Sequence, residues 1–214
     1  MLLHFAWRLL YNKLAWMFDF ASGCVSMGKW QAWGRTVILY LRHKRVLELA
    51  HGPGHLLIAL KTAGYHPIGI DLSPRMGRLA ARRLRRARLD VPLVRCRAQA
   101  LPFRSASFDN AVATFPTDYI LEPNTVREVA RVTSEQGRLV VVAGAQRTGP
   151  LPNSHFVNWL SQIIGQGGNK PGSHRSIFHQ SGMRARIEHQ PVGAGLVTLI
   201  IAEKKPGGWS TESR

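Results

Sequence analysis

The stretch that decides the fold is Val46-Leu47-Glu48-Leu49-Ala50-His51-Gly52-Pro53-Gly54, a short apolar run that ends in a turn with two glycines. A helical run from His55 to Ala63 follows it directly. Glycines let a ligand approach the backbone where a Cβ would clash, and the amides that begin the next helix offer hydrogen-bond donors. In an open α/β sheet, ligands lie where strands end and turn into helices. The stretch therefore predicts a ligand site at residues 50–54.

Downstream of this turn, strand-like and helix-like segments alternate. The predicted elements are a strand at 68–71, a helix from Pro74 to about Leu89 with Ser73 as its N-cap, strands at 91–96 and 109–115, a helix at about 124–132, and strands at 138–143, 185–189 and 196–202. This alternation predicts an α/β fold with a Rossmann-like, doubly wound, mostly parallel sheet covered on both faces.

The segments outside this pattern divide the chain into regions. We expect residues 1–44 to form an N-terminal helical cap and residues 45–205 the main domain. Residues 145–182 are rich in glycine and proline, and we expect them to cover the site and to contain one short helix near 156–164. Residues 206–214 have the composition of a loose tail.

Length and composition place limits on the protein class. The chain has 214 residues, of which 45% are hydrophobic and 19% charged, so it has a globular composition and disorder is excluded as its main state. Cys24 and Cys96 lack CxxC spacing and a matching histidine pair. Neither a disulfide scaffold nor a zinc site is predicted, no bound metal is expected, and a reducing, cytoplasmic compartment is favoured.

The charge is the unusual quantity. Lys and Arg number 29 against 12 Asp and Glu, which gives a formal net charge of +17. Such a charge attracts polyanions, either nucleic acid or the anionic face of a membrane, and the composition does not choose between them.

The N-terminal segment from Leu2 to Phe18 is nearly all apolar, but no charge-free run of eighteen residues is present, so a spanning helix is not predicted. His4, Arg8 and Asn12 lie four positions apart and would form a narrow polar stripe on a helix. The segment fits a helix in a membrane interface and equally a helix packed on the domain's own core.

Asp71 indicates the chemical class of the ligand. It ends the predicted second strand, seventeen residues after Gly54, where a carboxylate can accept two hydrogen bonds from a ribose diol. A dinucleotide site needs a third glycine close to Gly54, and Leu57 occupies that position. A ribose-bearing cofactor without a pyrophosphate is therefore favoured over a dehydrogenase cofactor.

The ordered segments 46–57, 69–76, 98–103 with 107–109, and 127–132 leading to 137–142 resemble the motifs of class I S-adenosylmethionine-dependent methyltransferases. They are most similar to the branch that contains the ubiquinone and menaquinone biosynthesis methyltransferases. The resemblance implies a seven-stranded sheet, S-adenosyl-L-methionine as cofactor, and methyl transfer as the reaction.

The resemblance also implies roles for individual positions. Glu48 would be the acidic residue of the first motif; Ala50, His51, Gly52 and Gly54 would line the methionine part of the cofactor; Asp71 would hold the ribose; Leu72, Ala98 and Gln99 would border the adenine; and Thr114, Phe115 and Pro116 would face the methionine end and the acceptor. Two positions depart from the family pattern. Ala50 replaces a glycine, and Arg97 replaces an aspartate that accepts from the adenine amino group, for which an arginine has no acceptor.

No catalytic base is assigned from the sequence. Asp118, Tyr119, His51 and His155 lie near the expected site, but each is better explained as a turn cap, a core edge or a residue of a solvated loop. Methyl transfer depends mainly on alignment of the acceptor with the methyl group, away from water.

The acceptor is predicted from two features. The arginine-rich helix after the second strand lacks the interleaved aromatic residues that stack on bases, and its residues Arg82 to Arg88 should lie far from the methyl group. The aromatic residues Trp7, Trp16, Phe18, Trp30 and Trp33 would build a lipophilic wall. We therefore expect a small, lipophilic acceptor, a quinone precursor or lipid headgroup, with peripheral contact to an anionic membrane. The alternatives are an RNA-directed methyltransferase, a small hydrophilic acceptor, and a non-catalytic protein of the same fold.

Overall fold

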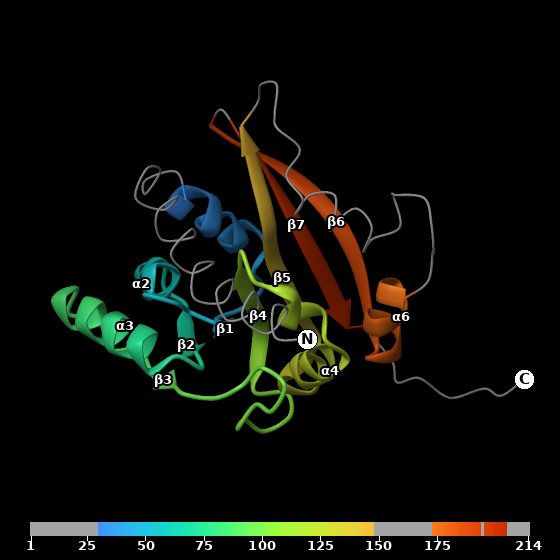
Figure 1. The fold of residues 1–214 in the computed structure, drawn as a ribbon, viewed down its shortest axis with the longest axis horizontal. Coiled ribbons are helices and arrows are strands. Elements are labelled where there is room, and N and C mark those ends of the chain that lie inside the picture. Colours follow the sequence, from blue (N-terminus) through green and yellow to red (C-terminus); the bar gives the residue numbers. More distant parts are fainter. Residues whose placement is uncertain (1–29, 148–172, 194, 205–214) are drawn as a thin grey trace, which may run out of the picture.

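A computed structural model describes residues 30–147, 173–193 and 195–204. Its centre is a seven-stranded sheet with the strand order β3-β2-β1-β4-β5-β7-β6 (Figure 1). The pairs β3/β2, β2/β1, β1/β4 and β4/β5 are parallel, whereas β5/β7 and β7/β6 are antiparallel. The predicted mostly parallel, doubly wound sheet is confirmed.

The first half of the sheet follows the sequence pattern closely. Its elements are β1 (Arg45–Leu49), α2 (His55–Thr62), β2 (His66–Ile70), α3 (Pro74–Arg86) and β3 (Leu93–Val94). Ser73 caps α3 as predicted, because its Oγ accepts a hydrogen bond from the Met76 amide and Pro74 takes the first helical position. A helical turn at 30–35 and a 3-10 helix, η1 (Thr36–Tyr40), precede β1.

The second half contains β4 (Phe108–Thr114), the 3-10 helix η2 (Asp118–Leu121), α4 (Pro123–Val132), β5 (Thr133–Arg147), α6 (Ser173–Gln180), β6 (Met183–Val192) and β7 (Gly195–Lys204). The last three strands are long and extend beyond the parallel part of the sheet (Figure 1). They form an antiparallel extension beside β4.

Several predicted boundaries were wrong. The third strand was expected over 91–96, but only Leu93–Val94 pairs with β2, opposite Gly69 and Ile70 at the end of that strand. The first residues of the segment expected to cover the site, 145–147, belong to β5, which pairs with β7 as far as Arg147. Helix α6, near the end of that segment, was not predicted. The helix expected near 156–164, the segment from Leu2 to Phe18 and the tail at 206–214 lie outside the described residues.

The core occupies both faces of the sheet, because side chains alternate along each strand. On one face Val46, Val112 and Val140 pack with buried residues of η1 and α2. On the other, the neighbouring strand positions pack with α4 and with Phe178 of α6. Both faces are therefore covered, as the alternation of elements predicted.

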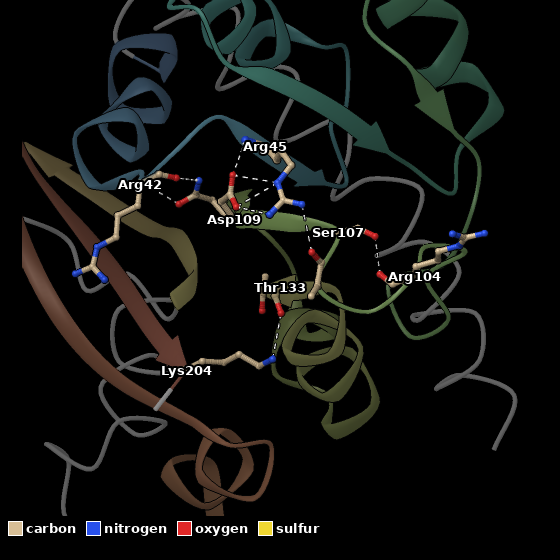
Figure 2. Close-up of polar contacts among 9 residues, drawn as sticks. Arg42, Arg45, Arg104, Ser107, Asp109, Thr133 and Lys204 are labelled. Atoms are coloured by element: carbon tan, nitrogen blue, oxygen red, sulfur yellow. Dashed lines mark hydrogen bonds and ion pairs between the residues drawn. The ribbon is translucent and has the colours of Figure 1, made fainter. Parts of the chain in front are cut away.

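Polar contacts join β1 and β4 at their amino ends, opposite the glycine turn (Figure 2). The Asp109 carboxylate accepts from the Arg45 backbone amide at 3.0 Å and from its guanidinium Nη2 at 2.6 Å. Asn110 exchanges hydrogen bonds with the backbone of Arg42. These contacts anchor the segment that enters β1.

The described residues include no helix with the length and apolar character that a membrane crossing requires.

Candidate functional site

The site lies at the carboxyl ends of β1, β2 and β4. The strand order reverses between β1 and β4, since β2 and β3 continue on one side of β1 while β4 lies on the other. Such a switch point leaves a crevice above the strand ends where ligands bind in doubly wound sheets. The turn at 50–54, Asp71 and Thr114 all meet at this edge of the sheet.

Asp71 joins the glycine turn to the start of α3. Its Oδ2 accepts from the Gly52 amide at 2.9 Å, and its Oδ1 accepts from the Ser73 amide at 2.8 Å. A carboxylate has about four lone-pair sites, so each oxygen retains acceptor capacity for a ligand hydroxyl. Asp71 is thus oriented by the backbone on both sides while it faces the cavity described next.

A cavity of about 270 Å³ opens beside Asp71. Five residues expected to bind a cofactor line it together: Ala50, Asp71, Leu72, Ala98 and Gln99. Its other lining residues are Ile70, Cys96, Arg97 and Tyr119. Glu48, His51, Gly52, Gly54, Thr114 and Phe115, which were also expected at the site, are not among the lining residues. Arg97, the departure noted in the sequence, stands in the cavity wall itself.

The glycine turn is shaped by α3 as well as by its own residues. Gly54 has φ +80°, and a Cβ there would lie 2.9 Å from Ala80 Cβ. Arg83 donates a hydrogen bond to the Pro53 carbonyl. The expectation that Arg82 to Arg88 all lie far from the site is wrong for Arg83, because it shares the inner face of α3 with Ala80. A helical wheel of the sequence could have found it, since at 100° per residue Arg83 lies only about 60° from Ala80, at the border of the apolar face.

Two non-glycine residues at the strand ends have left-handed backbone. Ala50 has φ +50° at the end of β1, and Phe115 has φ +49° after β4. Residues with a Cβ are strained there, and such strain collects at binding sites. The replacement of the family's glycine by Ala50 therefore strains the backbone in addition to narrowing the pocket.

Two buried polar groups near the cavity have no hydrogen-bond partner among the described residues: Glu48 Oε2 and the Tyr119 hydroxyl. Burial raises the pKa of Glu48 well above its ordinary value, and the charge of Asp71 raises it further. The same causes, burial first and then Asp71 and Glu48, raise the pKa of Tyr119. Sequence analysis placed Tyr119 near the site but gave it no cofactor role.

His51 is packed against the sheet. It is buried, and a Cβ on Gly69 of β2 would lie 2.9 Å from its ring. Its Nδ1 lies 2.7 Å from the Gly52 carbonyl oxygen, which can only accept, so this nitrogen carries a proton. Burial lowers the pKa of His51. The ring therefore supports the turn from behind.

Thr114 and Phe115 border the helical turn at 30–35. The Phe115 ring stacks on Trp30 with centroids 3.7 Å apart, and Trp33 lies 6.5 Å from Trp30. A Cβ on Gly34 would be in ordinary contact with the Thr114 methyl at 3.7 Å. The end of β4 thus carries an aromatic cluster, to which two of the tryptophans expected in a lipophilic wall contribute. The other three aromatic residues expected there, and His155, lie outside the described residues.

Comparisons with known proteins agree with this geometry. A family profile described as a methyltransferase domain matches residues 46–137. A ubiquinone/menaquinone biosynthesis C-methyltransferase of Syntrophotalea carbinolica is 26% identical, over 90% of this chain and 91% of its own length. A demethylmenaquinone methyltransferase of Mycolicibacterium vanbaalenii is 31% identical, over 72% of this chain and 67% of its own.

The chain belongs to the class I S-adenosylmethionine-dependent methyltransferases. Within them it falls in the branch of the ubiquinone and menaquinone biosynthesis methyltransferases, as the motifs indicated. Among solved structures, an S-adenosylmethionine-dependent methyltransferase of Thermotoga maritima, titled a possible histamine N-methyltransferase, has a TM-score of 0.59 at 16% identity, covering 91% of this chain and 98% of that one. The predicted fold class, reaction and cofactor are confirmed.

The residues of this methyltransferase fit its cofactor. The cavity combines apolar walls from Ile70, Leu72 and Ala98 with the Asp71 carboxylate, and the buried Tyr119 hydroxyl in its wall lacks a partner in the described part of the protein. A buried polar group without a partner is rare in native proteins, so this hydroxyl is available as a hydrogen-bond partner for a bound cofactor. Within the same described ranges, no three His, Cys, Asp or Glu side chains gather as metal ligands do.

Proposed function

We propose that this methyltransferase methylates a lipophilic quinone precursor, and that the cavity beside Asp71 holds its cofactor. The proposed substrate is supported by the names of the protein's relatives, which are called ubiquinone/menaquinone biosynthesis or demethylmenaquinone methyltransferases. The chain covers 91% of the length of the first of these relatives, so little of that relative lies outside the comparison.

In this proposal the ribose hydroxyls donate to Asp71. The two backbone amides that already bind its oxygens hold the carboxylate in one rotamer, so little side-chain entropy is lost on binding. Leu72 and Ala98 supply apolar contact for the adenine, and the Gln99 side chain at the cavity edge is held by Glu122 through a 2.7 Å hydrogen bond. Arg97 offers only donors, so the adenine amino group must find a backbone carbonyl instead.

The methionine end of the cofactor would lie toward the glycine turn. Gly52 adds no side chain to the open space beside the turn, whereas Gly54 makes room for α3, and Ala50 adds only a methyl group to the cavity wall. The Tyr119 hydroxyl and the Glu48 carboxyl are the buried polar groups left for the polar methionine atoms. Thr114 and Phe115 would separate this end from the acceptor.

The chemistry asks for alignment more than for proton transfer. S-adenosylmethionine supplies a methyl group on a sulfonium, which is an excellent leaving group. The protein contributes by holding the acceptor in line with that methyl and by excluding water. The Trp30 and Phe115 stack offers a flat apolar surface for a quinone ring at the end of β4. We assign no catalytic base, because His51 faces the sheet and the raised pKa of Tyr119 makes it a poor proton acceptor at neutral pH.

A lipophilic acceptor places the enzyme at a membrane surface. We propose that it acts in the cytoplasm with peripheral contact to an anionic membrane, to which its net charge of +17 is attracted. Residues 45–205 would form the methyltransferase domain and residues 1–44 an N-terminal cap over the acceptor.

The test combines cofactor binding with acceptor identity. Calorimetric titration with S-adenosylhomocysteine should give binding that is lost in Asp71→Ala and kept in Asp90→Ala, which removes an exposed carboxylate beyond α3. Labelled S-adenosylmethionine is then offered with a demethylated quinone in detergent, with phospholipid, and with RNA. Label in the quinone supports the proposal, whereas label only in the phospholipid or only in the RNA refutes the proposed acceptor.

A further inference from the structure

Helix α3 has two faces of opposite character. Ala80 and Leu84 are buried, and Leu84 packs with Leu57 of α2 and Val91. At 100° per residue, the opposite face carries five exposed arginines, which we call the α3 cationic face: Arg75, Arg78, Arg82, Arg85 and Arg86. From Leu72 to Leu89 the chain contains no acidic residue. The helix lies at the β3 edge of the fold, with no described element outside it (Figure 1).

Four of the five arginines of this face enter no ion pair between described residues. The ion pairs between described residues are made by Lys204 and by arginines outside α3, at positions 42, 45, 131, 138 and 186. Arg78, Arg82, Arg85 and Arg86 take part in none of them. Arg88 and Arg95 are exposed next to the same face and enlarge it. Exposed positive charges that are clustered in this way attract anionic partners from outside the chain.

Exposed apolar residues in α3 and just before it distinguish a lipid surface from a nucleic acid. Leu72 and Leu79 are 54% and 36% exposed, and they are two of the three large hydrophobic residues exposed in the described ranges. No aromatic side chain stands between the arginines to stack on bases. Arginines beside an exposed apolar residue, as around Leu79, are typical of helices that lie on anionic bilayers.

The position of Leu72 links the face to the active site. Leu72 lines the cofactor cavity and is also exposed, and α3 begins two residues later. The Arg95 guanidinium donates to the Leu72 carbonyl at 3.1 Å and so holds this corner in place. A bilayer in contact with the cationic face would therefore lie beside the entrance to the cavity.

We propose that the α3 cationic face docks the enzyme onto a bilayer of anionic phospholipid, with guanidinium groups on lipid phosphates and Leu72 and Leu79 at the headgroup boundary. The inference rests on the proposed function in one respect, since a lipophilic acceptor dissolved in the bilayer gives docking its purpose. Each arginine near an anionic surface strengthens binding by about five-fold. Removal of three charges should therefore weaken binding by roughly a hundred-fold.

The experiment measures flotation of the full-length protein with vesicles of phosphatidylcholine alone and of phosphatidylcholine mixed with phosphatidylglycerol. The variant is Arg78→Gln with Arg82→Gln and Arg86→Gln. The control carries the same charge change at exposed arginines on other elements, Arg104→Gln with Arg127→Gln and Arg184→Gln. We expect salt-sensitive binding to the anionic vesicles only, lost in the α3 variant and nearly retained in the control.

Three results would overturn the docking proposal. The first is equal loss in both triple variants, which would show an unspecific effect of net charge, and the second is unchanged binding in the α3 variant. Tighter α3-dependent binding to a random-sequence RNA than to the anionic vesicles would assign the face to RNA and also overturn it. Methylation of a short-chain, water-soluble quinone precursor without vesicles keeps the two proposals apart. If the α3 variant methylates it normally, a docking failure leaves the proposed function intact, and if no quinone is methylated, the docking result still stands.

Discussion

The packing of Gly54 against α3 gives a stability prediction that can be worked from the structure. Gly54 is buried with φ +80°, and an added Cβ would lie 2.9 Å from Ala80 Cβ and 3.2 Å from its Cα. Carbon atoms in contact prefer separations of about 3.5–4.0 Å, so Gly54→Ala forces two packed segments apart.

The expected destabilisation has two parts. A residue with a Cβ in left-handed backbone costs about 1–2 kcal/mol, of which roughly 0.4–1 kcal/mol is offset by the lower entropy of the unfolded chain. Overpacking adds about 1–3 kcal/mol. Gly182 supplies the control, because it has φ +73° and open space around its Cβ position, so Gly182→Ala carries only the backbone strain. We expect Gly54→Ala to destabilise by about 1–3 kcal/mol more than Gly182→Ala.

A second substitution tests whether the contact with Ala80 is the cause. Ala80→Gly alone costs about 1 kcal/mol as a glycine in a helix, plus the burial of one methyl group. In the double variant the overlap of the two Cβ atoms disappears, so the pair should be more stable than the sum of the single changes by about 0.5–3 kcal/mol.

Urea unfolding followed by circular dichroism measures these differences as shifts in the midpoint at constant slope. If Gly54→Ala is no worse than Gly182→Ala, or if Ala80→Gly fails to rescue it, the reasoning that α3 imposes glycine at this turn is refuted.

Three further predictions concern single side chains. Tyr119→Phe should weaken S-adenosylhomocysteine binding about five-fold in calorimetry, which corresponds to the loss of one hydrogen bond. Thermal stability should not fall, because the buried hydroxyl has no partner in the described protein. Unchanged affinity would contradict the cofactor role of Tyr119. Arg83→Met frees the Pro53 carbonyl, so KM for S-adenosylmethionine should rise more than kcat falls in steady-state kinetics, and an unchanged KM would show that the turn does not need this bond. Burial opposes ionisation of Asp109, but its hydrogen bonds and ion pair with Arg45 outweigh this effect and lower its pKa. The stabilisation by Asp109 is therefore complete above about pH 4 and is lost as the pH falls through the folded pKa. Asp109→Asn should reduce this loss of stability at acid pH, measured by urea unfolding at several pH values, and an unchanged loss would exclude Asp109 as its source.

The parallel half of the sheet could be predicted because its signals are local. The apolar runs, the glycine turn and the Ser73 cap each specify a boundary within a few residues. The lengths of β3 and β5 could not be predicted, because they depend on pairing partners far away in the chain. Strand β3 ends where β2 stops offering partners, and β5 continues to Arg147 because β7 pairs with it that far.

The site divides in the same way. Asp71, Leu72, Ala98 and Gln99 were predicted from ordered motifs and do line one cavity. Tyr119 received no cofactor role, because it lies in a 3-10 helix whose approach to β2 follows from the chain crossing over the sheet, which no short pattern encodes.

The two faces of α3 explain how a strongly basic chain can hold a cationic cofactor. The sulfonium carries positive charge, which the arginines would repel if they faced the cavity. Instead the Asp71 carboxylate lies at the strand ends beside the glycine turn, and most α3 arginines point away from Ala80 into solvent. Arg83 is the exception on the inner face, and it is bound to a carbonyl oxygen of the turn rather than exposed to the ligand. Because the buried and the cationic side chains occupy opposite sides of the helix, charge on the outer face can change without disturbing the turn, so binding to a surface and binding of the cofactor should respond to separate substitutions.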